Sequence, residues 1–381
     1  MAQVLRLFVK LGVTGFGGPA ATVAMMEDEV VNRRRWLTRT QFLDVVGVTN
    51  LIPGPNATEI AMHVGLVRAG WLGLITAGVS FIVPAAAITL GLAWLYARYG
   101  ALPAIAPLLA GIKPAVLAVI ATALWRLGKT GIKNGKLAVM GLVVLAASLW
   151  GVNEILALFA GGVLGMVWLQ ADSLRRPRSR PGAGAMGLLV PGLPLVARPL
   201  VGVAAPTVLQ LGLFFLKIGA VMYGSGYVLI AFLQGGLVDD LGWLTQQQLL
   251  DAIAAGQFTP GPLLSTATFI GYLLLGLPGA GVATVAVFLP SFVFSAILGP
   301  IVPRFRRSPW AAAFLDAVNA CSLGLMAAVA LELGASTLRS WPAVLILVLS
   351  AIAGLRWKLN SAWLVLGGAA IGGIAALLGW G

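Results

Sequence analysis

Apolar and polar positions divide the chain into long hydrophobic segments separated by short polar stretches. The uncharged run at residues 69–97 exceeds the roughly 20 residues with which an α-helix crosses the ~30 Å hydrocarbon core of a bilayer. Further hydrophobic segments follow at 101–125 and 137–169, and the sequence Gly151-Val152-Asn153-Glu154 leaves open whether the last one forms one span or two. The pattern predicts an all-α, polytopic membrane protein.

Two Pro-Gly-Pro sequences interrupt hydrophobic segments, the first at Pro53, Gly54 and Pro55 and the second at Pro260, Gly261 and Pro262. Proline removes a backbone donor, and an unsatisfied backbone group in hydrocarbon is costly, so such a break survives only where protein or a polar cavity surrounds it. The last proline of each motif suits the first turn of a new helix. We therefore expect each motif to form the tip of a re-entrant hairpin, whose second half-helix begins at Asn56 or Leu263.

The second half of the chain repeats the first at an offset of 207 residues, the separation of Lys10 and Lys217. At this offset the two Pro-Gly-Pro motifs coincide, and so do two capping boxes that begin at Thr38 and Thr245. Each repeat begins with a glycine-containing span, at 4–25 or 208–233, and is predicted to form about five transmembrane helices plus one re-entrant hairpin. The expected domains are an N-terminal repeat at 1–171, a cytoplasmic linker at 172–205 and a C-terminal repeat at 206–381.

The distribution of charge predicts how the repeats are oriented. Five crossings per repeat is an odd number, so the second repeat is expected to be inverted relative to the first. Basic clusters occur at 33–39, 126–136, 175–180 and 304–307, whereas Asp239 and Asp240 precede the second hairpin. Because loops rich in Lys and Arg remain in the cytoplasm, this distribution predicts inverted-topology repeats with both termini outside.

Composition narrows the class of protein further. Of the 381 residues, 59% are hydrophobic and 10% are charged, which is typical of a membrane protein and not of a soluble enzyme. Loops between the spans account for most of the net charge of +13, so no nucleic-acid partner is expected. Cys321 and His63 are the only residues of their kinds, which excludes an intrachain disulfide and a thiolate or imidazole metal cluster. We expect no metal, no cofactor and no enzymatic activity.

Inverted repeats would bring the N-termini of two half-helices together near the membrane midplane. Each N-terminus acts as roughly half a positive charge and offers unpaired amides, an arrangement that suits an anion. The residues expected to contact an oxyanion there are Asn56, Ala57, Thr58, Leu264, Ser265 and Thr266. The alternative is that these residues only cap their helices, although capping alone does not require a break at both equivalent places.

Charged residues inside hydrophobic segments are further candidates. Lys10 and Lys217 occupy equivalent positions in the first spans, and Lys113 precedes a proline in an uncharged segment. Such lysines either contact the anion or, near the end of a span, extend to the membrane surface. Glu59 lies one turn after Pro55. It either exchanges a proton and couples transport to protons, or pairs with Lys10 or Lys113.

Other titratable residues and several glycines complete the candidates. Asp44 and Asp251, equivalent in the two repeats, either gate transport or stabilise the N-terminal turns of their helices. His63 either titrates near neutral pH in a coupling role or is an interior residue with satisfied hydrogen bonds. Asn50 and Gln257 precede the breaks and are expected to support the freed backbone. Glycines that permit close approach to a helix or to the ligand are Gly17, Gly18, Gly224 and Gly226.

Several of these motifs occur together. They are Phe16-Gly17-Gly18-Pro19, Trp36-Leu37-Thr38 with Phe42, Asn50-Leu51-Ile52-Pro53-Gly54-Pro55, and Thr259-Pro260-Gly261-Pro262 followed by Ser265-Thr266-Ala267-Thr268. With these residues the chain, apart from the linker, resembles the chromate ion transporter family in its long, two-domain form. The resemblance implies a bacterial or archaeal inner-membrane protein that exports chromate, driven by the membrane potential or a proton gradient. The sequence contains nothing like a P-loop, in agreement with transport that does not use ATP.

The substrate follows from the resemblance, whereas the residues indicate only an oxyanion. Chromate is a tetrahedral dianion close in shape and charge to sulfate, and helix N-termini with lysines would bind either. We expect chromate as substrate, sulfate as a competitor and the lipid bilayer as the surroundings, and a homodimer is compatible with the sequence. The alternatives are a transporter of sulfate or another oxyanion, or an anion channel. A membrane-bound reductase is disfavoured because the sequence offers no cofactor site.

Overall fold

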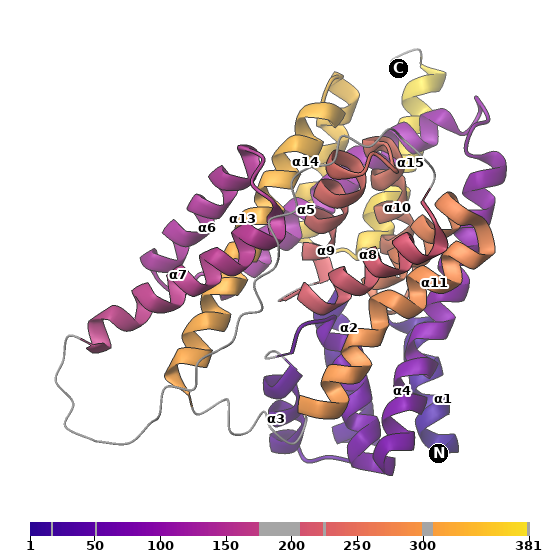
Figure 1. Ribbon diagram of the computed structural model, residues 1–381. Helices are drawn as coiled ribbons and strands as arrows, with labels where there is room; N and C mark the ends of the chain where they lie inside the picture. The colour runs from indigo at the N-terminus through magenta and orange to yellow at the C-terminus, as the bar shows by residue number, and fades with distance from the viewer. Residues whose placement is uncertain (17, 50–51, 175–205, 224–225, 299–307, 379–381) are drawn as a thin grey trace.

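The computed structural model describes residues 1–16, 18–49, 52–174, 206–223, 226–298 and 308–378, and these residues form helices without a single strand (Figure 1). The helices that are long and apolar enough to cross a membrane are α4 (Asn56–Tyr99), α5 (Ala106–Gly131), α7 (Glu154–Leu174), α11 (Thr266–Leu298) and α13 (Pro309–Thr337). Shorter apolar helices are α6 (Gly135–Leu149), α8 (Val208–Val221), α14 (Trp341–Arg356) and α15 (Ser361–Leu377). The predicted all-α, polytopic membrane class is confirmed.

The hydrophobic segment at 137–169 forms two helices. α6 ends at Leu149, and α7 begins at Glu154 after a short turn that contains Gly151 at φ +80°. Asn153 lies at this turn, and its side-chain oxygen accepts a hydrogen bond from the amide of Ile155 at 3.1 Å. The polar sequence between the two hydrophobic parts therefore ends one helix and starts the next.

The prediction of continuous first spans at 4–25 and 208–233 is wrong. α1 (Ala2–Thr14) stops before Gly15, and α2 (Gly18–Glu27) starts again at a glycine with φ +82°, followed by the π-helical turn η1 (Asp28–Arg33). In the second half, α8 is followed by η2 (Gly226–Val228), α9 (Leu229–Leu233) and η3 (Gln234–Asp240). Glycine and proline make helix continuation costly at these places, and the broken backbone finds partners elsewhere in the protein.

The helix before each Pro-Gly-Pro motif starts at the predicted capping box. α3 (Arg39–Thr49) follows Thr38, whose amide donates to Gln41 Oε1 at 2.9 Å while the Gln41 amide donates to Thr38 Oγ1 at 3.2 Å. α10 (Gln246–Phe258) follows Thr245, and its exchange with Gln248 has the same two distances, 2.9 and 3.2 Å. Equivalent sequences thus produce equivalent helix starts in the two halves.

The helices after the motifs, α4 and α11, each consist of two parts joined by a sharp kink. The kink lies at Ala69 and Gly70 in α4, where Gly70 has φ +63°, and at Leu275 and Gly276 in α11, where Gly276 has φ +64°. On either side of the first kink the two parts touch through glycines, since a Cβ on Gly73 would lie 2.1 Å from the carbonyl oxygen of Gly65. The first part of α4, residues 56–68, is therefore a half-helix roughly 20 Å long.

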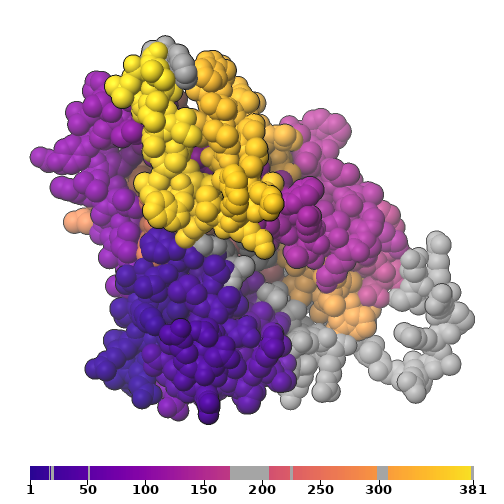
Figure 2. All heavy atoms as spheres, turned by 180° about the vertical axis from the view of Figure 1, so that it is seen from behind, coloured from indigo at the N-terminus to yellow at the C-terminus, as the bar shows by residue number. Residues whose placement is uncertain are grey.

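The helices pack into two adjoining groups. α4 contacts α1 and α11, and α11 contacts α8, while α5 packs with α14 and α15, and α13 packs with α6 and α7 (Figure 1). Viewed from behind, the indigo N-terminal segment forms the lower part of the molecule and the yellow C-terminal helices the upper part (Figure 2). The two groups are joined through α10, which contacts α5, α15, α11 and α4.

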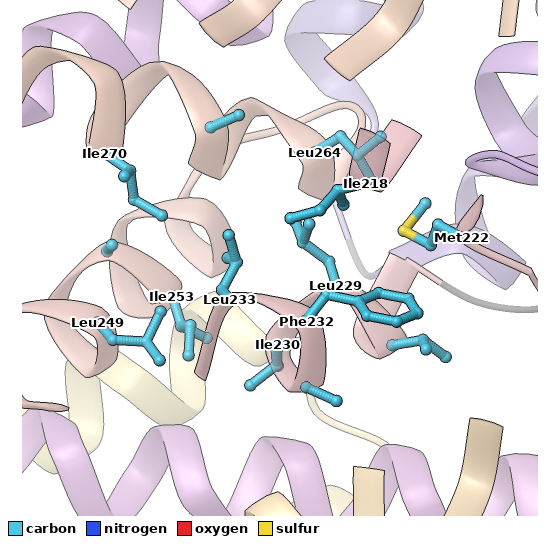
Figure 3. Packing of buried hydrophobic residues seen from close by; sticks show 14 of the residues in the cluster. Ile218, Met222, Leu229, Ile230, Phe232, Leu233, Leu249, Ile253, Leu264 and Ile270 are labelled. Atoms are coloured by element: carbon cyan, nitrogen blue, oxygen red, sulfur yellow. The ribbon is translucent and has the colours of Figure 1, made fainter. Parts of the chain in front are cut away.

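A hydrophobic core surrounds the short helix α9. Leu229 and Leu233 of α9 pack with Ile218 of α8, Ile253 of α10 and Leu264, which lies between α10 and α11 (Figure 3). A second buried cluster joins α1, α3 and α4 around the first Pro-Gly-Pro motif. The breaks in the chain are thus enclosed by packed side chains, as a break at membrane depth requires.

We predict that Gly73→Ala destabilises the protein by about 1–3 kcal/mol, because the added methyl group would meet the backbone carbonyl of Gly65 and force the two parts of α4 apart. The matched control is Gly91→Ala, where a Cβ has nothing within 4 Å and the helix should gain roughly 0.5–1 kcal/mol. Thermal unfolding of the detergent-purified variants measures both effects. Equal stability of the two variants would contradict the close packing at the kink.

Candidate functional site

Each Pro-Gly-Pro tip is held by the end of a helix from the other half of the chain. The amide of Gly54 donates to the carbonyl of Met222 at 2.7 Å, and the amide of Gly261 donates to the carbonyl of Gly15 at 3.0 Å. Met222 and Gly15 are the C-cap residues of α8 and α1. Each tip amide, which would be costly to leave unpaired in the membrane, therefore finds a carbonyl acceptor at the helix end of the other half.

A cavity of about 370 Å³ lies where the two tips meet. Its wall includes Pro55, Asn56 and Ala57 from the first tip and Gly261, Pro262 and Leu263 from the second. The rest of the wall comes from α2, α3, α4, α5, α10, α15 and η2 and from residues that follow α1 and α10. These residues are Gly15, Gly18, Thr22, Val23, Val46, Ile60, Leu127, Gly226, Tyr227, Gly256, Gln257, Thr259 and Ser361. This volume falls in the range of small-molecule sites.

The wall of the cavity carries neutral hydrogen-bonding groups. Gln257 is only 6% exposed, and its side-chain nitrogen Nε2, a donor, has no hydrogen-bond partner among the described residues. The Tyr227 hydroxyl is hydrogen-bonded to the same side chain. Ser361 and Thr22 add further hydroxyls, and the residues described as lining the cavity include no carboxylate. An unpaired buried donor facing a space without negative charge is suited to an oxyanion.

The N-terminus of the α4 half-helix faces the cavity. α4 begins at Asn56, as predicted, and the amide of Thr58 already bonds to the carbonyl of Pro55 at 2.8 Å. Asn56 and Ala57, the first two residues of the helix, line the cavity. The positive end of the helix dipole is therefore directed at the cavity.

Other residues expected at the anion lie behind the tips, and the described cavity wall does not include them. Thr58, Leu264, Ser265 and Thr266 are buried. The Thr266 hydroxyl donates to the carbonyl of Leu263 at 2.8 Å, and Ser265 lies 3.1 Å from the Thr89 hydroxyl, which also bonds to Thr259. These hydroxyls connect the second tip to α4.

The three candidate lysines also lie outside the cavity wall. Lys10 forms an ion pair with Glu29 at 2.6 Å, and Lys217 is exposed with its ammonium 5.7 Å from the ring centroid of Phe214. Lys113 interacts electrostatically with Asp251. The polar groups at the cavity are thus helix ends and neutral side chains. The three lysines interact with other residues outside the cavity wall.

The candidate coupling residues occupy different environments. Glu59 is fully buried behind the first tip, and the carbonyl oxygen of Glu59 lies 3.0 Å from Nδ1 of His63. Asp251 accepts a hydrogen bond from the Tyr96 hydroxyl at 2.8 Å, which joins α10 to α4. Asp44 is exposed on α3. Glu59 has neither Lys10 nor Lys113 as a described ion-pair partner.

Among the candidate glycines, Gly18 and Gly226 line the cavity. Gly17, Gly224 and Asn50, together with residues 175–205 of the predicted linker, lie outside the described residues.

Sequence reasoning missed Thr22, Tyr227, Thr259 and Ser361 as wall residues and assigned Gln257 only a supporting role. Gln257 and Thr259 adjoin the second Pro-Gly-Pro motif, so their positions were available as a signal. Ser361 is the first residue of α15, and its hydroxyl donates to the carbonyl of Gln257 at 3.5 Å. Nothing in the local sequence marks it, because only the packing of α15 beside α10 brings it to the cavity.

Several membrane-length helices surround a cavity whose largely apolar wall carries a few hydrogen-bonding groups, an arrangement typical of membrane transport proteins. The chain belongs to the chromate transporter family, which matches it twice, over residues 2–166 and 209–373. The two matches are separated by the same 207 residues that separate Lys10 from Lys217.

Curated relatives agree with this assignment. The chain is 33% identical to the chromate transport protein of Cupriavidus metallidurans over 99% of this chain and 93% of that protein. It is 32% identical to a probable chromate transport protein of Synechococcus elongatus (94% and 91% covered) and 31% identical to the chromate transport protein of Pseudomonas aeruginosa (99% and 91% covered). No solved structure matches the chain.

The ion pair beside α1 yields a prediction about pH. A hydrogen bond from Lys10, assisted by Arg34, holds the pKa of Glu29, which lies outside the membrane-length helices, below its usual value of 4.5. Because the pKa is lower in the folded than in the unfolded protein, the stabilisation is present above pH 4.5 and is lost as the pH falls through the folded-state pKa. Glu29→Gln should therefore cost roughly 1 kcal/mol near neutral pH and less in acid.

Thermal unfolding at several pH values measures this difference. The control is Glu27→Gln, whose partner Arg39 is 78% exposed at 3.5 Å, and it should change stability little at any pH. A Glu29→Gln penalty that stays constant down to acid pH would show that the ion pair is not its source.

Proposed function

We propose that the protein is a secondary transporter that exports chromate, a tetrahedral oxyanion, from the cytoplasm across the inner membrane. The observation that carries this proposal is the cavity between the tips, with the unpaired Gln257 donor and the start of α4 in its wall. The names of the relatives support chromate as the substrate. Sulfate, which has the same charge and shape, would meet the same donors and is expected to compete.

We further propose that the two halves are inverted repeats, each with a re-entrant hairpin built from the helix before the Pro-Gly-Pro motif and the half-helix after it. The reciprocal bonds of Gly54 and Gly261 and the matching kinks at Gly70 and Gly276 support this arrangement. In such a protein, rocking of one repeat against the other would expose the site to each side in turn. The Asp251–Tyr96 bond between α10 and α4 is a candidate for opening during this motion.

The membrane potential supplies sufficient driving force for export. Moving one elementary charge through 100 mV is worth about 2.3 kcal/mol, so a dianion leaving a negative interior gains about 4.6 kcal/mol. The alternative source of energy is a proton gradient, which would drive chromate in the direction in which the coupled protons move. Neither requires ATP. An anion channel would also let chromate leave under the membrane potential, and it differs in showing no coupling to protons or another ion.

The transport proposal is tested by chromate flux into liposomes that contain the purified protein and carry an imposed potential. The expected result is flux that sulfate inhibits. Gln257→Leu should weaken apparent chromate affinity by roughly tenfold or more, because a hydrogen bond to a charged group is worth about 1.5–3 kcal/mol. The control is Gln247→Leu, an exposed residue on the same helix, which should behave as wild type.

No potential-driven flux in the wild type would refute the transport proposal. Equal flux in Gln257→Leu and Gln247→Leu would remove Gln257 from the site. Flux that shows no coupling to protons or another ion would favour the channel.

The proposed topology is tested by cysteine labelling in intact cells. Cys321 is buried and is replaced by alanine to remove background. Arg33→Cys should then react only after the membrane is permeabilised, and Asp240→Cys should react from outside, since the repeats place equivalent loops on opposite sides. Labelling of both positions from the same side would rule out inverted repeats.

A further inference from the structure

A buried polar cluster lies directly behind the first tip and outside the cavity. Glu59 is fully buried, one turn into α4. The point that a Cβ on Gly54 would occupy is 2.1 Å from Glu59 Oε1 and 2.4 Å from the Ser291 hydroxyl of α11. Both groups therefore pack against the side of Gly54 on which other residues carry a Cβ atom. The amide of Gly54 is the group that bonds to Met222 and holds the tip in place.

The Glu59 carboxyl group lacks compensation within the described part of the protein. Neither of its oxygens has a hydrogen-bond partner of good geometry, and the adjacent Ser291 hydroxyl is at most a weak donor to it. No ion pair between described residues includes it. A carboxylate buried with no cation and with one weak hydroxyl donor is unfavourable, and binding a proton removes the charge.

The same helical turn faces both this cluster and the cavity. Pro55, Asn56 and Ala57 line the cavity, and Glu59 lies three residues after Asn56. Residues with this spacing on a helix have Cβ atoms about 5–6 Å apart. A dianion at the start of α4 and a negative charge on Glu59 would therefore repel each other strongly in an interior of low dielectric constant.

We propose that Glu59 is a proton-binding site linked to the oxyanion cavity, so that the anion binds when Glu59 carries a proton and the two cross the membrane together. The inference rests on the transport function proposed above. The linkage is reciprocal: protonation of Glu59 raises the affinity for the anion, and the bound anion raises the affinity of Glu59 for the proton by the same factor. A proton on Glu59 removes the repulsion between the carboxylate and the anion. The backbone amides at the tip can then attract the anion.

The second half has no equivalent site. The residue at the position of Glu59 is Thr266, whose hydroxyl is already bonded to Leu263, and Ala85 takes the place of Ser291 beside Gly261. One proton therefore accompanies each dianion, and the net charge exported is one and not two. In this scheme the membrane potential drives export, whereas a proton gradient directed into the cell opposes it.

The other titratable groups near Glu59 must be separated from it in any test. They are His63 on the same helix, with Nε2 unpartnered, and Tyr223 after α8, which interacts electrostatically with Glu59. The serine hydroxyls that α11 presents do not titrate. His63→Gln and Tyr223→Phe therefore identify the group that takes up the proton.

The experiment is titration calorimetry of chromate binding to the full-length protein, in buffers of different ionisation enthalpy and over a range of alkaline pH, where chromate is a dianion. Once the pH exceeds the pKa of Glu59 in the free protein, the wild type should take up close to one proton per chromate and lose up to about tenfold in affinity per pH unit. Glu59→Gln, a neutral mimic, should take up none and bind chromate equally well at every pH. His63→Gln, Tyr223→Phe and the distant control Glu332→Gln should keep the wild-type proton uptake.

Proton uptake that persists in Glu59→Gln, or that disappears in His63→Gln, would overturn the assignment to Glu59. Flux through the wild type gives a test that needs no variant, because a pH gradient should drive chromate in the direction in which protons move. Movement of chromate in the direction opposite to the protons would overturn the proton linkage, whereas the proposal that the protein transports chromate would stand. Absence of chromate binding at every pH would instead refute the transport function itself.

Discussion

The exchange of two backbone hydrogen bonds between the halves of the chain is the interaction on which the rest of this structure depends. A Pro-Gly-Pro break at membrane depth exposes amides and carbonyls that hydrocarbon cannot satisfy. Here Gly54 bonds to the end of α8 and Gly261 to the end of α1, so the break in each half completes the interrupted helix of the other. The early ends of α1 and α8 and the position of the cavity follow from this exchange.

The same exchange brings chemically different groups to one place. The first tip contributes Asn56 and, behind it, Glu59, whereas the second contributes Leu263 and Thr266. Matching backbones with unlike side chains make an asymmetric site, in which one half carries the titratable group and the other supplies Gln257. The backbone frame is thus approximately symmetric, whereas the side chains proposed to hold an anion and a proton are not.

Much of the local structure was predictable from short-range signals. The capping boxes at Thr38 and Thr245, the helix start at Asn56 and the all-helical class required only neighbouring residues and the length of hydrophobic runs. The continuous first spans were predicted wrongly, because a hydrophobic run indicates burial but does not reveal that a helix within it is broken at Gly15. That break is stable only because Gly261, far away in the sequence, donates to the freed carbonyl.

The sequence by itself determined the membrane class, the duplication and the places where the backbone must break, because these depend on composition, repetition and the chemistry of proline and glycine. Only the tertiary structure decided which candidates share one space. Lys10 lies beside Glu29, while Ser361 reaches the cavity through the packing of α15 against α10. The physical reason is that a side chain's neighbours at a site come from helices distant in sequence, whose contacts are fixed by packing and not by local propensity.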